Sequence, residues 1–344
     1  MKDIFTIGIT GCCGKTSTSL YIYYFLKKHN VDVCYIGTHK IYYKDIYINT
    51  KNTTLEVDQL YDYFNIYKIN PRVIVMEVSS HGINQARINN FKFDIVGLTN
   101  LGSDHLDYHL CKKNYHSVKS AFLLKNTGVL KIFIPIKYIY RINFNKKIYY
   151  YKVNKRLFKN FNVIKYDYNN LYLAFKILIQ MNYRKKDILN SLYNIKLNNG
   201  RGEIITHNNR KIIIDYAHHV ESFKSILKDN NYNKVVIFGC GGNRDKSKRN
   251  IMGKIACKYC KYVIITIDNP RNENLNDINN DITKYISNYE IINDRYEAIN
   301  YAINKYSNLD IYILGKGDET FIEYKDDIIP FNDKEIVNKI INLD

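Results

Sequence analysis

Residues able to bind a phosphate lie close to the start of the chain. The string Gly8-Ile-Thr-Gly-Cys-Cys-Gly-Lys-Thr-Ser17 follows an apolar run and opens a helical pattern. Glycines let backbone N–H groups approach a phosphate, and a helix start adds positive potential. Lys15 would reach the β- and γ-phosphates of a nucleotide, and the Thr16 hydroxyl would bind Mg²⁺. The string therefore predicts a phosphate-binding loop rather than an ordinary strand–helix turn, although Ile9 stands at the first glycine position of the strict pattern.

Two further polar clusters each follow an apolar run. Glu77 comes directly after Val73–Met76, and the segment Thr99–His109, which contains His105, comes after Ile95–Leu98. Ligands gather at the carboxyl ends of parallel strands. A carboxylate there can bind Mg²⁺ directly or through water, whereas capping or solvation is the plain alternative for Glu77. A lone histidine is more often structural, so the case for His105 rests on its position in this third cluster.

The elements that must position these side chains alternate between buried strands and helices. Helical stretches follow Lys15, surround Asp58–Tyr67 and cover Lys113–Leu124. Such alternation predicts a parallel α/β sheet. The expected strands of the first half are Ile4–Ile9, Val31–Ile36, Val73–Met76 and Ile95–Leu98, with further strands within Lys131–Asn162 and later helices at Asn170–Met181 and Lys186–Tyr193.

A turn-rich stretch, Leu197–Gly202, divides the chain. A second α/β rhythm follows it, with expected strands at Lys211–Ile214, Val235–Phe238, Tyr262–Thr266 and Ile311–Leu314. The expected fold class is therefore α/β. A phosphate-loop domain with a mainly parallel sheet would span residues 1–198, and a Rossmann-like α/β domain would span residues 199–344.

Composition limits the classes of function. The net charge is +18, but the basic residues are scattered and Lys, Asn, Ile and 33 Tyr dominate throughout, which favours an A/T-biased genome over a nucleic-acid partner. Seven cysteines include Cys257 and Cys260, but no second pair completes a zinc site, so we expect free thiols in a reducing cytosol. The apolar runs are too short for a membrane span and the N-terminus does not look like a signal peptide, so we expect a cytoplasmic protein.

Longer polar and glycine-rich strings lie in both halves of the chain. In the first half they are Glu77-Val-Ser-Ser-His-Gly with Gln85 and Arg87, Asn100-Leu-x-x-Asp-His-Leu-Asp-Tyr-His109, and Asn52-Thr-Thr54. In the second half they are Asn199-Gly-Arg-Gly-Glu203, Asp215-Tyr-Ala-His218, Gly239-Cys-Gly-Gly-Asn-Arg-Asp-Lys-x-Lys-Arg249, Asp268-Asn-Pro-Arg271 and Gly315-Lys-Gly-Asp-Glu319. Together these strings resemble the Mur ligase family, and they are most similar to its MurE branch, which adds an amino acid to a peptidoglycan precursor in cell-wall synthesis.

The resemblance implies roles for particular residues of the first half. ATP would contact Gly11, Cys12, Cys13, Gly14, Lys15, Thr16 and Ser17, together with Arg201 and Asp215 from the second half. Mg²⁺ would be held by Thr16, Glu77, His105 and Lys119. Lys119 matches the lysine that this family carbamylates, although by residue type alone it would be a solvated charge on a helix. Lys15, Lys119 and His105 would be catalytic. The substrate UDP-MurNAc-L-Ala-D-Glu would contact Thr53, Thr54, Ser79, Gln85 and Arg87.

The second-half strings imply an amino-acid site. Asp268–Arg271 is similar to the motif of ligases that select meso-diaminopimelate, and lysine-selecting relatives lack the arginine. An arginine can bind the distal carboxylate of diaminopimelate bidentately, and Glu319 would suit its distal ammonium group. The implied contacts are Arg244, Asp268, Asn269, Pro270, Arg271, Gly315 and Glu319.

The implied reaction is ATP-driven amide formation through an acyl phosphate, by a monomer with no nucleic-acid or membrane partner. The family's N-terminal uridine-binding domain has no match in this sequence, so we expect weak uridine binding or a separate polypeptide that supplies it. Smaller departures are Cys12-Cys13, Gly202, His219-Val220 and Asp318, and none removes an expected metal ligand. The alternatives are another ligase of this fold, such as a folylpolyglutamate synthase, and a degenerate, non-catalytic nucleotide-binding protein.

Overall fold

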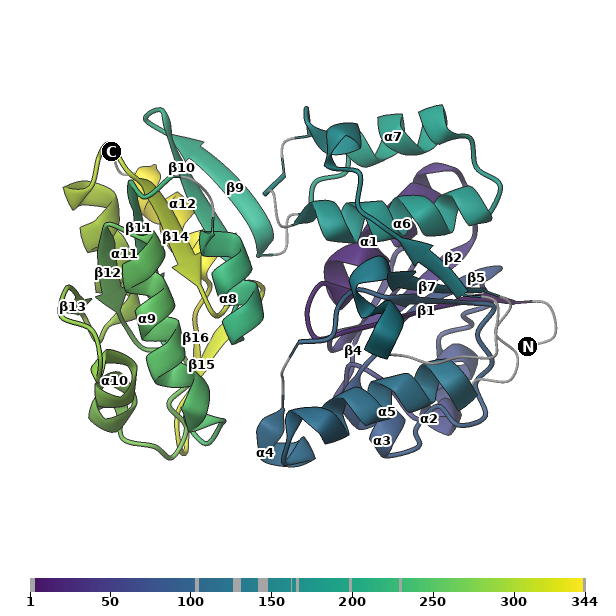
Figure 1. Ribbon diagram of the computed structural model, residues 1–344, viewed down its shortest axis with the longest axis horizontal. Helices are drawn as coiled ribbons and strands as arrows, with labels where there is room; N and C mark the ends of the chain where they lie inside the picture. The colour runs from purple at the N-terminus through teal and green to yellow at the C-terminus, as the bar shows by residue number, and fades with distance from the viewer. Residues whose placement is uncertain are drawn as a thin grey trace. The chain divides into compact units, whose positions relative to one another are not determined.

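The structure, a computed structural model, describes residues 4–102, 105–125, 131–141, 148–161, 163–164, 167–197, 200–228 and 231–342. It divides into two compact units (Figure 1). The first unit comprises Met1–Asn162 and Asp167–Ile195, and the second comprises Val163–Tyr166 and Lys196–Asp344. The expected boundary between residues 198 and 199, and Asp104 of the histidine-containing string, lie outside the described residues.

The first unit is built on an eight-stranded sheet with the order β4-β3-β2-β5-β1-β6-β7-β8. Its strands are β1 (Phe5–Thr10), β2 (Val33–Gly37), β3 (Lys40–Tyr43), β4 (Ile46–Asn49), β5 (Val73–Val78), β6 (Ile95–Leu98), β7 (Lys131–Pro135) and β8 (Ile148–Tyr151). Its helices are α1 (Lys15–Lys28), α2 (Val57–Ile66), α3 (Ser80–Asn84), α4 (Leu106–His109), α5 (Lys112–Lys125), α6 (Tyr168–Gln180) and α7 (Lys185–Tyr193), with 3₁₀ turns at Ile136–Arg141 and Lys155–Phe158. The six strands β2, β5, β1, β6, β7 and β8 pair in parallel in that order. Strands β3 and β4 extend the β2 edge as an antiparallel hairpin.

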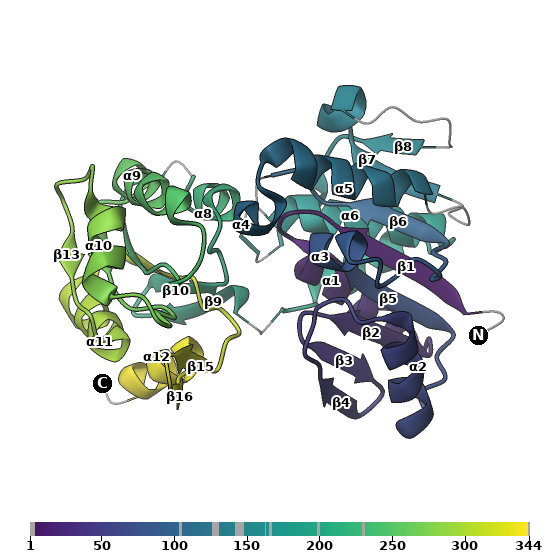
Figure 2. The ribbon, with the colours of Figure 1, turned by 90° about the horizontal axis from the view of Figure 1, so that it is seen from below.

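Helices cover both faces of this sheet (Figures 1 and 2). Helices α1, α6 and α7 lie on one face, and α2, α3 and α5 lie on the other. Phe64 of α2 and Phe122 of α5 pack in one buried cluster with Ile74 and Met76 of β5. Because both faces are buried, the central strands are continuous apolar runs rather than alternating ones.

The second unit is built on a six-stranded sheet with the order β13-β12-β11-β14-β10-β9. Its strands are β9 (Arg201–His207), β10 (Arg210–Asp215), β11 (Lys234–Phe238), β12 (Tyr262–Ile265), β13 (Glu290–Ile291) and β14 (Asp310–Leu314), and β15 (Phe321–Glu323) pairs separately with β16 (Ile328–Pro330). Its helices are α8 (Val220–Leu227), α9 (Arg249–Tyr259), α10 (Leu275–Thr283), α11 (Arg295–Lys305) and α12 (Asp333–Ile341). Helices α8, α9 and α10 pack on one face of the sheet, and α11 and α12 pack on the other. Strand β9 alone is antiparallel to its neighbour in this sheet.

The α/β class and the mainly parallel sheet are confirmed, with two differences in detail. Within Lys131–Asn162, β7 and β8 are strands but the two other described elements are 3₁₀ turns, and residues 142–147 and 162 lie outside the description. Strand β9 begins at Arg201, inside the stretch expected to be a turn. Gly202 (φ 70°) follows at once, and the register with β10 shifts there, so a glycine bulge starts the strand. Among the described residues, no helix is long and apolar enough to cross a membrane.

Candidate active site

The expected phosphate-binding loop joins the carboxyl end of β1 to the start of α1. Gly11 (φ 148°) and Gly14 (φ 82°) have positive-φ backbone conformations, which favour glycine. A Cβ at Gly11 would lie 1.9 Å from Oγ1 of Thr99, and one at Gly14 would lie 2.1 Å from Oδ1 of Asn170. The two glycines are therefore required both by their backbone angles and by the closeness of their neighbours.

Hydrogen bonds fix the shape of this loop. Lys15 Nζ donates to the carbonyl oxygens of Gly11 and Cys12, at 3.1 Å each, so the lysine arches back over the loop. The Asn100 side chain accepts from the N–H groups of Cys12 and Cys13, at 3.2 Å each, and donates to the Cys13 carbonyl at 2.8 Å. Asn100 lies in one of the recognised strings but received no role from the sequence. Here it holds the loop from the end of the neighbouring strand β6.

Glu77 is fully buried in β5 and faces hydroxyl groups. Thr16 Oγ1 donates to its Oε2 at 3.0 Å, and Tyr35 Oη donates to its Oε1 at 2.5 Å. The Thr38 N–H also donates to Oε1, at 3.2 Å, and the Thr38 hydroxyl lies 3.3 Å from Oε2. Thr16 and Glu77, both expected at the metal, are thus brought together. Carboxylate and hydroxyl oxygens are hard donors of the kind that Mg²⁺ prefers, so this group fits that ion.

Lys119 and His105 both follow β6 in the chain, and their side chains have different neighbours. Lys119, on α5, is 1% exposed, which rules out a solvated charge. Its Nζ donates to Thr10 Oγ1 at 3.3 Å and lies 5.0 Å from the centre of the Tyr115 ring. The His105 ring lies 4.5 Å from the His81 ring, and His105 has φ 51°. Among the described residues, there is no group of three or more His, Cys, Asp and Glu side chains that could hold a metal ion.

Four of the five residues expected to contact the sugar-dipeptide substrate bond to one another. Thr54 Oγ1 accepts from the Ser79 N–H at 2.9 Å. Arg87 Nη1 donates to the Thr54 carbonyl at 2.9 Å, and Arg87 also donates to the Gln85 side chain. Thr53 is half-buried next to them in the chain. These side chains therefore form one group that follows β4 and β5.

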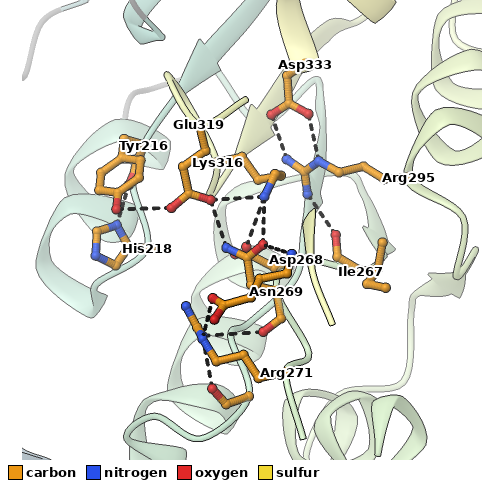
Figure 3. Close-up of polar contacts among 12 residues, drawn as sticks. Tyr216, His218, Ile267, Asp268, Asn269, Arg271, Arg295, Lys316, Glu319 and Asp333 are labelled. Carbon is orange, nitrogen blue, oxygen red and sulfur yellow. Dashed lines mark hydrogen bonds and ion pairs between the residues drawn. The ribbon is translucent and has the colours of Figure 1, made fainter. Parts of the chain in front are cut away.

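In the second unit, polar residues follow the carboxyl ends of β10, β12 and β14 (Figure 3). Glu319 is bonded on both carboxylate oxygens. Tyr216 Oη donates to Oε1 at 3.3 Å, and Asn269 Nδ2 and Lys316 Nζ donate to Oε2 at 2.8 Å and 3.0 Å. Lys316 is fully buried, also donates to Asn269 Oδ1 at 3.1 Å, and lies 3.8 Å from Asp268 Oδ1. Lys316, which the sequence interpretation passed over, thus connects the expected amino-acid contacts Asp268, Asn269 and Glu319.

Arg271 lies at the edge of this network (Figure 3). Its Nη1 donates to the Gly242 carbonyl at 3.1 Å, and its Nε forms a 2.7 Å ion pair with Glu323 Oε2. Arg244 is exposed, and its side chain has no polar contact with the described residues. It is therefore not part of the hydrogen-bond network around Lys316 and Glu319. It still flanks the same glycine as Arg271, because a Cβ at Gly241 would lie 3.1 Å from Arg271 Nη1 and 3.6 Å from Arg244 Cγ.

The remaining expected residues of this unit lie near the ends of β10, β12 and β14. Asp215 is buried, and its carbonyl accepts from the Gly315 N–H at 3.1 Å. A Cβ at Gly315 would lie 3.0 Å from Asp268 Oδ2, and the Pro270 carbonyl accepts from a backbone N–H in the next turn. Arg201 Nη2 forms a 3.0 Å ion pair with Asp318 Oδ1. Asp318 is one of the departures noted in the sequence, and its carboxylate makes this ion pair.

Comparison with known proteins identifies the family. Residues 9–199 match the Mur ligase middle domain, and residues 200–317 match the Mur ligase glutamate ligase domain. The chain is 34% identical to the UDP-N-acetylmuramoyl-L-alanyl-D-glutamate–2,6-diaminopimelate ligase of Buchnera aphidicola subsp. Baizongia pistaciae, over 98% of this chain and 76% of the relative. It is 33% identical to the ligase of the same name from Caldanaerobacter subterraneus, over 97% of this chain and 77% of the relative. The chain belongs to the Mur ligase family.

Solved Mur ligases and related enzymes have the same fold. A UDP-N-acetylmuramoyl-L-alanyl-D-glutamate–2,6-diaminopimelate ligase matches with a TM-score of 0.63 at 24% identity, over 99% of this chain and 79% of that one. The folylpolyglutamate synthase of Thermotoga maritima matches with a TM-score of 0.64 at 17% identity, over 91% of this chain and 86% of that one. Mur ligases and folylpolyglutamate synthases therefore share this fold, so the fold does not separate the two classes. The relatives above 30% identity do, because they are Mur ligases.

Proposed function

We propose that this Mur ligase joins meso-diaminopimelate to UDP-MurNAc-L-Ala-D-Glu, with ATP as the source of energy, in the synthesis of peptidoglycan precursors. The observation that carries the proposal is the combination of sequence relatives above 30% identity, which bear the name of this activity, with the network around Asp268, Arg271 and Glu319. A folylpolyglutamate synthase has less support, because that class matches only as a fold, at 17% identity or below for the structures compared.

The first unit supplies the phosphate chemistry in this proposal. Mur ligases in general depend on ATP and Mg²⁺. The loop from Gly11 to Ser17 would bind the phosphates of ATP, with Lys15 turning from its loop carbonyls toward the β- and γ-phosphates. Thr16 and Glu77 would hold Mg²⁺, which when bound offsets negative charge on the transferring phosphoryl group.

The reaction has two chemical steps. The γ-phosphoryl group of ATP passes to the glutamate carboxylate, which forms an acyl phosphate and releases ADP. The α-amine of diaminopimelate then attacks the acyl carbon, loses a proton and expels inorganic phosphate, which leaves an amide. Arg271, Asp268, Asn269 and Glu319 would orient the diamino acid, with Pro270, Gly315 and Arg244 lining its site, and Arg201 and Asp215 would contact the nucleotide.

Lys119 is proposed to act as a carbamate. The lysine ammonium first loses a proton, and the neutral amine then adds CO₂ and releases a second proton, which leaves a buried anionic oxygen ligand beside Thr10. His105 would share this second metal site. Carbon-13 NMR of protein equilibrated with ¹³C-labelled bicarbonate tests the modification, with Lys113→Ala, an exposed lysine on the same helix, as the control. A carbamate signal that survives Lys119→Ala would contradict the assignment.

Thr53, Thr54, Ser79, Gln85 and Arg87 are proposed to contact the sugar-dipeptide substrate. The bonds among four of them would present hydroxyl and guanidinium groups as one surface. Residues 1–198 would form the ATP-binding domain and residues 199–344 the amino-acid-binding domain.

Turnover by the purified chain tests the proposed function. Phosphate release and product mass are measured with ATP, Mg²⁺ and UDP-MurNAc-L-Ala-D-Glu, with and without meso-diaminopimelate. We expect phosphate release that depends on diaminopimelate and a product equal to the two substrates less one water. Lys15→Ala should abolish both, and Lys28→Ala, an exposed lysine on the same helix, should change neither. ATP binding without any ligated product would refute the proposal.

A further inference from the structure

The guanidinium group of Arg271 is held along two of its edges. Its Nε forms the 2.7 Å ion pair with Glu323, and its Nη1 donates to Gly242 O at 3.1 Å and lies 3.5 Å from Asn269 O. Among the described residues, Nη2 has no hydrogen-bond partner, and the side chain is 21% exposed. The two Nη2 N–H groups are therefore the donors that remain for a ligand.

Glu323 is held in a similar way. Its backbone N–H donates to Asn269 Oδ1 at 2.9 Å, and its carbonyl accepts from the Arg271 N–H at 3.1 Å. Oε2 of its carboxylate forms the 2.7 Å ion pair with Arg271 Nε, and within the described part of the chain Oε1 has no hydrogen-bond partner. Its side chain is 37% exposed. A fixed carboxylate with one oxygen available thus lies against a fixed guanidinium with one nitrogen available.

The charges of this pair select what can bind beside it. Arg271 and Glu323 together are neutral, and Glu319 is matched by the buried cation Lys316. A ligand end group with a carboxylate alone would leave the pair with a net negative charge, and one with an ammonium alone would leave it positive. An end group that carries both groups on one carbon adds no net charge to the Arg271–Glu323 pair and gives each charge of the pair an opposite partner.

We propose that Glu323 is a specificity-determining residue that, together with Arg271, reads the zwitterionic distal end of the diamino acid. The distal carboxylate binds Arg271 Nη2, and the distal ammonium donates to Glu323 Oε1. This inference rests on the proposed function, because it assumes that diaminopimelate binds in this unit. Glu319 does not bind the distal ammonium alone, because its two oxygens already accept three hydrogen bonds. Glu323 supplies a further carboxylate oxygen for it.

A pair of amino acids that differ only at the distal carbon tests the proposal. The ligation rate is measured against the concentration of meso-diaminopimelate and of L-2-aminopimelate, which lacks the distal amine, for wild type and Glu323→Gln. Glutamine keeps an oxygen for Arg271 Nε but turns an NH₂ group toward the ligand ammonium. We expect kcat/KM for diaminopimelate to fall about tenfold while that for 2-aminopimelate changes less than about twofold.

Each other outcome overturns the proposal in a distinguishable way. Equal losses for both amino acids would mean that Glu323 only positions Arg271. Gains for both would mean that Glu323 competes with the ligand for the guanidinium. Glu335→Gln, which removes an exposed carboxylate from α12, is the matched control and should leave both rates unchanged. If wild type turns over neither amino acid, the proposed function itself fails, whereas normal diaminopimelate turnover with unaltered discrimination in Glu323→Gln refutes only the role of Glu323.

Discussion

At the scale of single residues, the buried carboxylate of Glu77 and the half-buried carboxylate of Glu319 differ in what neutralises them. Glu77 receives hydrogen bonds from the neutral groups of Thr16, Tyr35 and Thr38. Glu319 receives one from the ammonium of Lys316. Hydrogen bonds from neutral donors leave the charge of Glu77 uncompensated, and this suits a metal cation. Glu319 is already paired, which suits an orienting role toward a ligand.

Glu77→Gln tests this difference. Glutamine keeps the shape of the side chain and removes the charge, so Mg²⁺-dependent ATP binding should weaken at least about tenfold. The free energy of unfolding without ligand should not fall, because an uncompensated buried charge is removed. Calorimetric titration of ATP at several Mg²⁺ concentrations and urea unfolding measure the two effects. Wild-type Mg²⁺ dependence in the variant would argue against Glu77 as a metal ligand.

Arg271→Ala tests the amino-acid site by itself. Loss of a charge-assisted contact to the distal carboxylate should raise KM for diaminopimelate about 10- to 100-fold. The dissociation constant of ATP should change less than about twofold, because Arg271 belongs to the second unit and its side chain bonds to Gly242, Asn269 and Glu323 there. Equal losses of diaminopimelate use and ATP binding would refute the assignment of Arg271.

Asp167 provides a pH-dependent test of the hydrogen bonds that support the phosphate loop. It accepts hydrogen bonds from Tyr21 of α1 and from Asn170, and Asn170 lies against Gly14. Burial raises the pKa of Asp167 from 3.8 to about 6. The folded state therefore binds this proton more tightly than the unfolded state. Stability contributed by Asp167 is complete below about pH 4 and is lost as pH rises to about 6, by roughly 3 kcal/mol in all.

Asp167→Asn removes this titration. The asparagine oxygen can still accept from Asn170, and its NH₂ group can donate to the Tyr21 oxygen. The slope of unfolding free energy between pH 4 and 6 should be shallower in the variant than in wild type, as measured by urea unfolding at each pH. Identical slopes would show that Asp167 does not titrate in this range.

At the scale of elements, the ends of strands bring the polar residues together, and helices hold those ends in place. Arg295 of α11 forms a fully buried, bidentate ion pair with Asp333 of α12, at 2.7 Å and 2.8 Å (Figure 3). The same guanidinium donates to the carbonyls of Ile267 and Leu314, at 3.2 Å each. These carbonyls immediately precede Asp268 and Gly315. The pair thus fixes two strand ends that carry the proposed amino-acid site.

Asp333→Ala should destabilise the second unit by about 3–5 kcal/mol, because it leaves a buried guanidinium without its partner. Urea unfolding measures the loss. The double variant Arg295→Met, Asp333→Leu should recover most of that stability while KM for diaminopimelate stays raised, because the two carbonyl contacts are still missing. Full recovery of KM in the double variant would show that the ion pair does not position the site.

The central strands and most helices could be predicted because buried parallel strands are continuous apolar runs. The hairpin of β3 and β4 was not predicted, since it lies at the sheet edge and Tyr47 of β4 is 67% exposed. The site residues within recognised strings could be proposed from sequence. Their supports could not, because contacts such as Tyr35 with Glu77 and Lys316 with Asn269 join strand ends whose adjacency depends on the order of strands in each sheet.

At the scale of the whole molecule, each unit has a core of its own. The first is centred on residues such as Ile74 and Phe122, and the second has separate clusters on the two faces of its sheet. Because each unit buries its own apolar surface, loss of one core need not unfold the other. The net charge of +18 adds a positive field that favours encounter with anionic ATP and the UDP-linked substrate.

Separate cores predict separate responses to ligand. We expect urea to unfold the full chain in two transitions, and ATP with Mg²⁺ to stabilise chiefly the one that reports on the first unit, which contains the phosphate loop, Thr16 and Glu77. At a free ATP concentration of 100 times its dissociation constant, that transition should gain about 2.7 kcal/mol. Lys15→Ala should remove the stabilisation by ATP without moving the transition of the second unit. Ile313→Ala, in the core of the second unit, should lower the stability of that unit by about 2–5 kcal/mol and leave the stabilisation by ATP intact. A single transition that shifts as a whole in both variants would show that the two cores unfold as one, and the effects of Asp167 and Asp333 would then have to be measured on that shared transition.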